Sequence, residues 1–335
     1  MKNKKPLKNQ KKLMVKALDL LQKNSIRALE KAKEQILNEK LESEKARKAL
    51  KYYAENWNDT THPGILALAC KAIGGNITKA EQVQIAMLYL SAAIDLLDDV
   101  LDKSKVKNGK PTVFGRYGQD IALLLSNAMM IKGFTLLYGC SKDFTQETFK
   151  ALMETIKADF YEMGNANLLE IDLKGKVDVS PEICMSILEK KAASIAIHIK
   201  IGAIIGGGSL EEIEALTTYG KILGMLIILR EEFIDIFEPA ELKNRIKNEI
   251  LPVPILFAFK DRETKRKILN ILSKPKVSEE DASKIVEYVF QSKNVEKLRR
   301  RLKRLANNAV KSLSIFKRIR NKELELLIKG AIEDL

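Results

Sequence analysis

Apolar residues recur through most of this chain three, four and seven positions apart, which is the spacing of one face of an α-helix. The periodicity predicts one or two amphipathic helices over about 11–56. A Thr61 cap followed by Pro63 then predicts the start of a buried helix that stops at Gly74 and Gly75. A long helix is expected next, over about 80–101.

The second half of the chain shows the same pattern over about 119–138, 146–170 and 210–237. Further helices are expected from Ser180-Pro181 and in the buried segment LPVPILFAF. No alternating strand pattern of any length is present, and no repeat of fixed period. The predicted fold class is therefore all-α, with basic amphipathic N-terminal helices over 1–56 and a single helical domain over 57–335.

The segment IDLLDDVLDKS, residues 94–104, places four aspartates in an otherwise apolar helix: Asp95, Asp98, Asp99 and Asp102. At helical spacing three of them project from one face, where like charges repel. A helix without a ligand would avoid this, so a cation is expected there. Mg²⁺ takes one or two carboxylates together with substrate phosphates. The alternative is a solvated acidic helix end.

A second acidic cluster lies in ILREEFIDIF, where Glu231, Glu232 and Asp235 repeat the arrangement. Two such helices facing each other across a cavity would hold metal ions between them, and a diphosphate bound to those ions is a good leaving group. This cluster supports a metal site less strongly, because an amphipathic helix with an acidic edge has the same pattern.

Positive charge is concentrated in three places. The net charge is +14, and residues 1–51 contain sixteen Lys or Arg against six Asp or Glu. A second basic run, KLRRRLKR, covers 297–304. The loop over 105–118 follows the first acidic cluster, so its Lys107, Lys110 and Arg116 are placed to bind phosphate beside the metals. Nucleic acid is not expected without interleaved aromatics or a recognition helix, which leaves solvated helix faces or weak contact with a membrane surface.

The sequence does not indicate a membrane-spanning, secreted or zinc-binding protein, or a serine-type hydrolase. No run reaches about 18 apolar residues without a charge, so no membrane span is predicted, and the basic N-terminus lacks the apolar core of a secretion signal. Scattered Cys70, Cys140 and Cys184 suit reduced thiols of the cytoplasm. His62 and His198 lie too far apart in the sequence to predict a zinc site or a serine-type triad.

Five segments occur in a fixed order over about 62–258: DDVLD, GKPTVFGRYG, the Lys191-Ala192 dipeptide, YGKILG and REEFID. In order and spacing they resemble the trans-isoprenyl diphosphate synthases, also called polyprenyl synthetases. The resemblance implies the isoprenoid-synthase helical bundle around a deep apolar central cavity. It also implies three Mg²⁺ ions, held by the two acidic clusters around an allylic diphosphate.

The same resemblance implies roles for single residues. Asp98 and Asp102 match metal ligands with catalytic roles, supported by Asp99, and the second cluster supplies Glu231 first, then Asp235, with Glu232 beside them. Lys191 matches a catalytic lysine that binds the leaving diphosphate. Ala93 and Ile94 match the cavity floor, and the small Ala93 implies room for at least a farnesyl tail. The other residues expected around the diphosphate are Lys107, Lys110, Asn167 and Arg230.

The chain departs from the family where isopentenyl diphosphate would bind. Asp59, His62 and Ser91 stand in place of a lysine, an arginine and a histidine. Paired arginines become Lys107 and Asn108, a threonine becomes Ala192, and KNEILPVP replaces a later glycine-lysine segment. A diphosphate needs cations to hold it, and Asp59 would repel it.

The sequence thus predicts an Mg²⁺-dependent prenyltransferase-family enzyme that ionises an allylic diphosphate of the farnesyl or geranylgeranyl class. The acceptor is expected to be a peptide or another nucleophile, not isopentenyl diphosphate, as in ComQ-type relatives that prenylate a peptide. Two alternatives stay open: a class I terpene synthase that cyclises the allylic cation, and a non-catalytic subunit of a heteromeric synthase. A cytoplasmic homodimer is expected, with membrane-surface contact through the N-terminal helices as the alternative.

Overall fold

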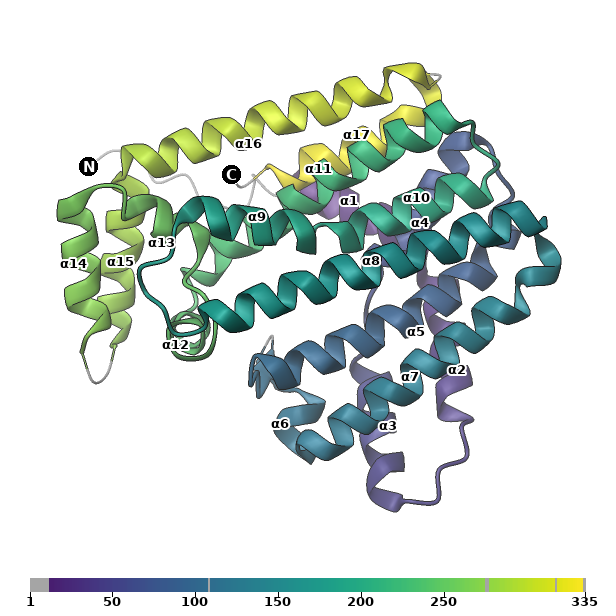
Figure 1. Cartoon of the computed structure of the whole chain (residues 1–335), viewed down its shortest axis with the longest axis horizontal. Helices are drawn as coiled ribbons and strands as arrows, with labels where there is room; N and C mark the ends of the chain where they lie inside the picture. The colour runs from purple at the N-terminus through teal and green to yellow at the C-terminus, as the bar shows by residue number, and fades with distance from the viewer. Residues whose placement is uncertain (1–11, 108, 275–276, 317, 334–335) are drawn as a thin grey trace. The chain divides into compact units, whose positions relative to one another are not determined.

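The computed structural model describes residues 12–107, 109–274, 277–316 and 318–333 (Figure 1). Its first helices are α1 (Lys12–Lys23), α2 (Ile26–Leu37), α3 (Glu44–Asn56), α4 (Thr61–Ile73), α5 (Ile77–Leu101), α6 (Val113–Tyr117), α7 (Gln119–Gly139) and α8 (Gln146–Leu173). The later ones are α9 (Pro181–Lys191), α10 (Ala193–Ile205), α11 (Leu210–Asp235), α12 (Pro239–Asn248), α13 (Val253–Ala258), α14 (Arg262–Leu272), α15 (Glu279–Gln291), α16 (Lys293–Ser312) and α17 (Arg318–Ala331). The all-α prediction is confirmed.

Three details differ from the sequence prediction. The stretch predicted as one or two N-terminal helices forms three, α1 to α3. The helix expected from Pro63 begins at Thr61, and the Asp59 side chain, not Thr61, accepts its first backbone N–H groups. Strands β1 (Val106–Lys107) and β2 (Lys110–Pro111) pair antiparallel in the basic loop. Two residues are too few for an alternating pattern to show in the sequence.

The chain divides into two compact units. Unit 1 comprises residues 1–17, 157–196 and 217–335, and unit 2 comprises residues 18–156 and 197–216. Helices α2 and α3 share a hydrophobic core with α5 and α7 in unit 2. The boundary between the units therefore does not coincide with the one predicted near residue 56.

Unit 2 is built around α5, which runs beside α7 (Figure 1). Asn76 begins α5 by accepting a hydrogen bond from the Thr78 backbone N–H at 2.9 Å. The two helices approach so closely that a Cβ on Gly133 of α7 would lie 2.6 Å from the Leu90 side chain of α5. Gly133 thus permits the packing that holds α5 in place.

Unit 1 contains α9, α12 to α17 and the adjoining parts of α8 and α11. Ser180 and Pro181 begin α9 in the predicted order, with the Ser180 hydroxyl accepting from Glu182 N–H. The helix predicted in LPVPILFAF is α13, which packs on α16. In the core, the Tyr219 hydroxyl of α11 donates to the Leu324 carbonyl of α17 at 2.7 Å.

Helix α7 carries an exposed apolar stripe. Among the described residues, 119–143 is the one segment long and apolar enough to cross a bilayer, although a core helix of a soluble protein passes the same test. The sequence prediction missed it because it required a run free of charge. Leu124, Ile131 and Tyr138, seven residues apart, are 65%, 69% and 76% exposed. Their spacing places them on one face.

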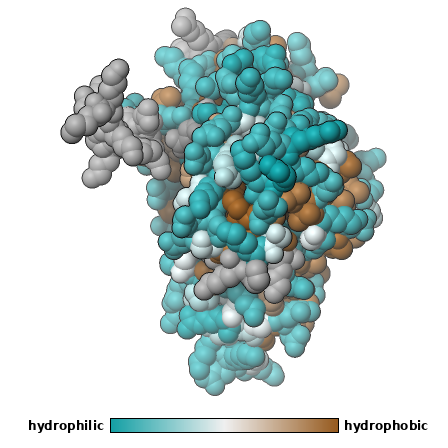
Figure 2. All heavy atoms as spheres, turned by 90° about the vertical axis from the view of Figure 1, so that its left-hand side faces the viewer, coloured by the Kyte–Doolittle hydropathy of each residue, from teal (hydrophilic) through white to brown (hydrophobic). Residues whose placement is uncertain are grey.

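Figure 2 views the structure from the side where Figure 1 labels α14 and α15. Hydrophilic residues predominate on this face, and hydrophobic ones gather in small groups among them. Small apolar groups of this kind are normal on the surface of a folded protein.

Candidate active site

The first acidic cluster lies at the C-terminal end of α5. The Asp102 N–H donates to the Asp98 carbonyl at 2.9 Å, so Asp98 and Asp102 sit on successive turns even though α5 ends at Leu101. Both are partly exposed, whereas Asp99 is 8% exposed and faces the protein. Side chains four residues apart stack on a helix. Asp98 and Asp102 therefore form a stacked pair of carboxylates that is partly exposed to solvent.

The carboxylates of the first acidic cluster are candidate ligands of Mg²⁺. Among the described residues, no three His, Cys, Asp or Glu side chains converge as a ready metal site. Mg²⁺ commonly uses one or two carboxylates and completes its octahedron with phosphate and water. Asp98 and Asp102 fit this mode of binding, in which the ion arrives with a diphosphate.

Lys107 of β1 folds back onto the acidic cluster. Its Nζ lies 2.8 Å from Asp99 Oδ1 and 3.4 Å from Asp95 Oδ1. Burial raises the pKa of Asp99 to about 6, against the lowering effect of Lys107. Burial lowers the pKa of Lys107, but the neighbouring aspartates outweigh it and raise that pKa above its usual value. Lys107 thus stays charged and offsets the repulsion within the cluster.

The other two loop cations predicted to bind phosphate, Lys110 and Arg116, lie against α3. Lys110 Nζ donates to Asn56 Oδ1 at 3.0 Å, and the Arg116 guanidinium sits 4.5 Å from the centre of the Tyr52 ring. In the structure each side chain thus contacts a residue of α3. Binding of a diphosphate by Lys110 and Arg116 stays a prediction.

Aromatic rings lie beside the acidic cluster, and the sequence analysis did not single them out. Tyr53 of α3 and Trp57, the residue after that helix, have ring centroids 5.5 Å apart, and Trp57 is 5.8 Å from Tyr89 of α5. Burial chiefly raises the pKa of Tyr53, and Asp95, Asp59 and Asp99 raise it further. Tyr53 is thus close both to the acidic cluster and to Asp59 at the start of α4.

The positions expected to hold isopentenyl diphosphate form a polar group of their own. Asp59 Oδ1 accepts the backbone N–H groups of Thr61 and His62 at 3.1 Å each, and Oδ2 lies 2.9 Å from His62 Nδ1. Burial raises the pKa of Asp59, but His62 and then His198 lower it more, so it falls below its ordinary value. This carboxylate therefore carries a negative charge at neutral pH.

The two histidines are in contact although they lie far apart in the sequence, and among the described residues they belong to no ready metal site. Their ring centroids are 4.7 Å apart, and His198 Nε2 lies 3.4 Å from Ser91 Oγ. Their separation of 136 positions in the sequence hid this contact. The sequence offered one indication of this contact, namely that the chain has two histidines in all.

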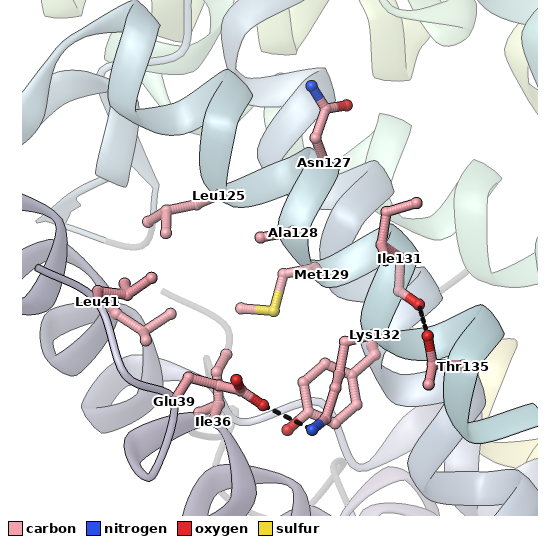
Figure 3. Close-up of a pocket in the computed structure, with 12 residues that line it drawn as sticks. Ile36, Glu39, Leu41, Leu125, Asn127, Ala128, Met129, Ile131, Lys132 and Thr135 are labelled. Carbon is pink, nitrogen blue, oxygen red and sulfur yellow. Dashed lines mark hydrogen bonds and ion pairs between the residues drawn. The ribbon is translucent and has the colours of Figure 1, made fainter. Parts of the chain in front are cut away.

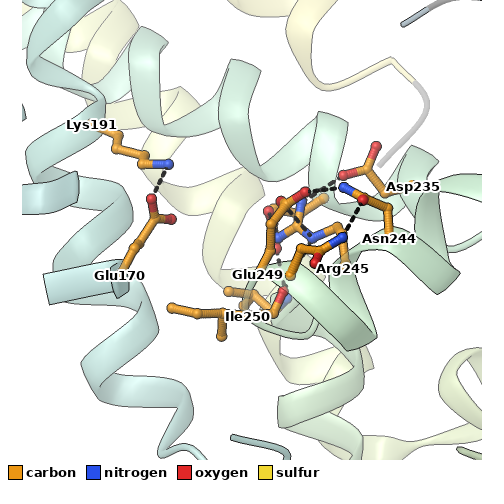
Figure 4. Close-up of polar contacts among 10 residues, drawn as sticks. Glu170, Lys191, Asp235, Asn244, Arg245, Glu249 and Ile250 are labelled. Carbon is orange, nitrogen blue, oxygen red and sulfur yellow. Dashed lines mark hydrogen bonds and ion pairs between the residues drawn. The ribbon is translucent and has the colours of Figure 1, made fainter. Parts of the chain in front are cut away.

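The second acidic cluster surrounds Arg245 of α12, which the sequence analysis did not identify (Figure 4). Arg245 Nη2 lies 2.5 Å from Glu232 Oε1, and Nη1 lies 2.7 Å from Asp235 Oδ2. Glu232 Oε2 accepts the Val253 N–H at 2.7 Å. With both oxygens engaged and the residue 4% exposed, Glu232 does not fit a metal ligand. Glu231, by contrast, is exposed.

Lys191, expected to bind the leaving diphosphate, ends α9 and forms an ion pair with Glu170 of α8 (Figure 4). Asn167 is on α8 one turn before Glu170, and Arg230 directly precedes the second cluster on α11; both are half-buried. The structure thus places these predicted residues in unit 1 with the second cluster.

The predicted cavity floor lies inside the core of unit 2. Ala93 is fully buried, Ile94 is half-buried, and Ser126 of α7 donates to the Ala93 carbonyl at 2.7 Å. One turn earlier on α5, Tyr89 lines a pocket of about 460 Å³ together with Leu125 and Met129. Figure 3 shows the ion pair of Glu39 and Lys132, 2.6 Å long, at this pocket.

The architecture defines the class of protein first. Over 96% of its length this chain matches the geranylgeranyl pyrophosphate synthetase of Pyrococcus horikoshii, covering 98% of that chain with a TM-score of 0.83 at 19% identity. It also matches a polyprenyl synthase from Caulobacter crescentus, with a TM-score of 0.77 at 17% identity, over 94% of this chain and 97% of that one. The fold is the isoprenyl synthase helical bundle, as predicted.

The sequence then identifies the family. The polyprenyl synthetase family model matches residues 43–289, so the chain belongs to that family and is an enzyme of the prenyltransferase class. The short chain isoprenyl diphosphate synthase of Methanothermobacter thermautotrophicus is 26% identical over 68% of this chain and 69% of its own length. The geranylgeranyl diphosphate synthase of Methanosarcina mazei is 25% identical over 61% and 63%.

Proposed function

We propose that this chain is an Mg²⁺-dependent prenyltransferase that ionises an allylic diphosphate of the farnesyl or geranylgeranyl class and uses an acceptor other than isopentenyl diphosphate. One observation carries the proposal. Within unit 2, an aspartate cluster suited to a metal-bound diphosphate accompanies Asp59 and two histidines, which are unsuited to a second diphosphate.

In the proposed first step, the allylic diphosphate ionises among residues of α5, β1 and the end of α3. Asp98 and Asp102 would hold Mg²⁺, which would supply positive charge that makes diphosphate a better leaving group. Lys107 limits the repulsion among the aspartates. The Tyr53 and Trp57 rings offer π-electron faces to an allylic cation and help to exclude water.

The charge around Asp59 argues against isopentenyl diphosphate as the acceptor. An arrangement of lysine, arginine and histidine would give this anion charge-assisted hydrogen bonds, each contributing about 1.5–3 kcal/mol. Asp59, His62 and Ser91 supply no permanent positive charge, since a histidine can lose its proton and any charge on His62 is already paired with Asp59. The loss amounts to several powers of ten in affinity.

The test measures binding and turnover together. We expect farnesyl or geranylgeranyl diphosphate with Mg²⁺ to raise the melting temperature and to release diphosphate without isopentenyl diphosphate. Isopentenyl diphosphate alone, at millimolar concentration, is expected to leave the melting temperature unchanged. Ala93→Phe should shorten the longest allylic substrate accepted, if Ala93 and Ile94 form the floor. A longer prenyl diphosphate as the product would contradict the proposal.

The same screen separates the alternatives. Hydrocarbon products from the allylic diphosphate alone would identify a terpene synthase. Absence of turnover with geranyl, farnesyl and geranylgeranyl diphosphates, with and without isopentenyl diphosphate, would favour a non-catalytic subunit.

A further inference from the structure

Both histidines of the chain come together at the start of α4, and close helix packing brings them there. A Cβ on Gly202 of α10 would lie 2.2 Å from the Leu66 carbonyl of α4, so the two backbones are in contact at this point. His198 lies four residues before Gly202, and His62 four residues before Leu66. One turn from the contact, the centroids of the two imidazole rings therefore lie 4.7 Å apart, with the ring planes tilted by 46°.

Asp59 determines which nitrogen of His62 carries the proton. Its Oδ2 is 2.9 Å from His62 Nδ1, and a carboxylate can only accept there, so Nδ1 is the protonated nitrogen. In the neutral ring Nε2 then holds the lone pair. A proton arriving at Nε2 produces an imidazolium that Asp59 stabilises. This is the electrostatic arrangement of a general base.

Helix capping explains only part of this group. Capping of α4 uses Asp59 Oδ1, which accepts the Thr61 and His62 backbone N–H groups, and leaves the Oδ2 contact with the ring unexplained. His198 is 3% exposed in the apolar helix α10, where a polar ring is costly to bury. An aliphatic residue would fill the same space at lower cost. His62 and Ser91 are only partly buried, so the group is accessible to a small molecule.

The group lies on the same part of unit 2 as the acidic cluster. Ser91 is seven residues before Asp98 on α5, which places it on the same face and about 10 Å away along the helix axis. Tyr53 links the two regions, since Asp59 and Asp95 both raise the pKa of its hydroxyl. A prenyl group ionised at Asp98 and Asp102 would therefore lie about two helical turns from Ser91, on the same side of α5.

We propose that His62, positioned by Asp59, His198 and Ser91, accepts the proton of an uncharged acceptor that carries an O–H or N–H group. The inference rests on the proposed function. The C1–O bond of the allylic diphosphate breaks, and its electron pair leaves with diphosphate. The acceptor's lone pair forms the new bond to C1, and its proton moves to His62 Nε2, from which solvent removes it. The paired rings take one proton at a time, because two imidazolium ions in contact repel.

The test uses the full chain with Mg²⁺ and farnesyl or geranylgeranyl diphosphate, with water and then phenol as uncharged acceptors. His62→Gln is expected to lower kcat for prenyl alcohol and prenyl phenol ether formation about 100-fold or more, with KM for the allylic diphosphate unchanged. The rising limb of the wild-type pH profile should disappear. In His62→Gly, free imidazole should restore part of the rate, which a purely structural role does not predict.

The exposed Asn58 in the same loop provides the control, and Asn58→Gln should behave as wild type. The stabilisation of His62→Gln by allylic diphosphate and Mg²⁺, measured by thermal shift, should equal that of wild type. Wild-type kcat and pH profile in His62→Gln would overturn the proton-acceptor assignment alone. A longer diphosphate made from isopentenyl diphosphate would overturn the proposed function. Hydrocarbon products would exclude the O–H or N–H acceptor, and absence of turnover would overturn both.

Discussion

The aspartates at the end of α5 in unit 2 differ in burial and in their contacts. Asp99 is buried against Lys107, whereas Asp98 and Asp102 are partly exposed on successive turns of one helix. The contact of Asp99 with Lys107 stabilises the protein itself. Aspartates that look alike in sequence thus differ in burial, with Asp99 buried and Asp98 and Asp102 partly exposed.

Asp98→Ala is expected to lower the rate of diphosphate release by at least 100-fold and to leave the melting temperature without ligand equal or slightly higher. The substitution removes a ligand and also relieves repulsion within the cluster. Diphosphate release and thermal shift, each with and without Mg²⁺, measure the two effects. Asp120→Ala, an exposed carboxylate on α7, is the matched control. Near-normal turnover in Asp98→Ala would contradict the assignment of Asp98 as a ligand of Mg²⁺.

At the scale of elements, the end of α11 and helix α12 are joined by a buried network of charges. Arg245 is 13% exposed at its side chain and contacts Glu232 and Asp235, with Glu249 3.7 Å away. Burial lowers the pKa of Arg245, but the three carboxylates outweigh it and raise that pKa. A guanidinium of the chain thus occupies the centre of the cluster that the sequence predicted for metal.

Arg245→Ala is expected to lower the free energy of unfolding by about 3–5 kcal/mol, because it leaves buried carboxylates without their partner. Urea unfolding followed by circular dichroism measures the change. Arg300→Ala is the control, since the exposed pair of Arg300 and Glu296 one turn apart on α16 should contribute at most about 0.5 kcal/mol. Equal effects of the two substitutions would show that the Arg245 network does not stabilise unit 1.

At the scale of the whole molecule, the apolar stripe of α7 is exposed in the single chain. Its Leu124, Ile131 and Tyr138 are each more than 60% exposed, although α7 packs on α5 along its other face. Apolar stripes of this kind mark contact with another surface. A second copy of the chain is the partner that the sequence analysis expects.

We expect the protein to elute with a mass of twice 37.8 kDa in size-exclusion chromatography with light scattering. Ile131→Lys should weaken the dimer about 30-fold, the effect of losing about 2 kcal/mol at an interface centre. Leu210→Lys, at a residue 87% exposed outside the stripe, should leave the dimer intact. A monomer at micromolar concentration that binds anionic vesicles would instead assign the stripe to a membrane.

Patterns among residues close together in the sequence were enough to predict most of the helices. Apolar spacing, the Ser180-Pro181 start and the proline-started α13 depend on residues within a few turns of one another, so they can be read without a structure. The aspartates of α5 were identified for the same reason, because four residues of one helix keep their relation wherever the helix packs. The family followed from the order of such segments.

Packing between distant segments decided the chemistry around those helices. His62 meets His198 because Gly202 lets α10 approach α4, and Arg245 reaches Glu232 because α12 folds back on α11. No short-range pattern encodes either contact, since each depends on where whole helices come to rest. A carboxylate in the sequence shows only that a charge is present. Its partner, whether a guanidinium, an imidazole or a metal-bound substrate, is set by the side chains that the tertiary structure brings within about 3 Å.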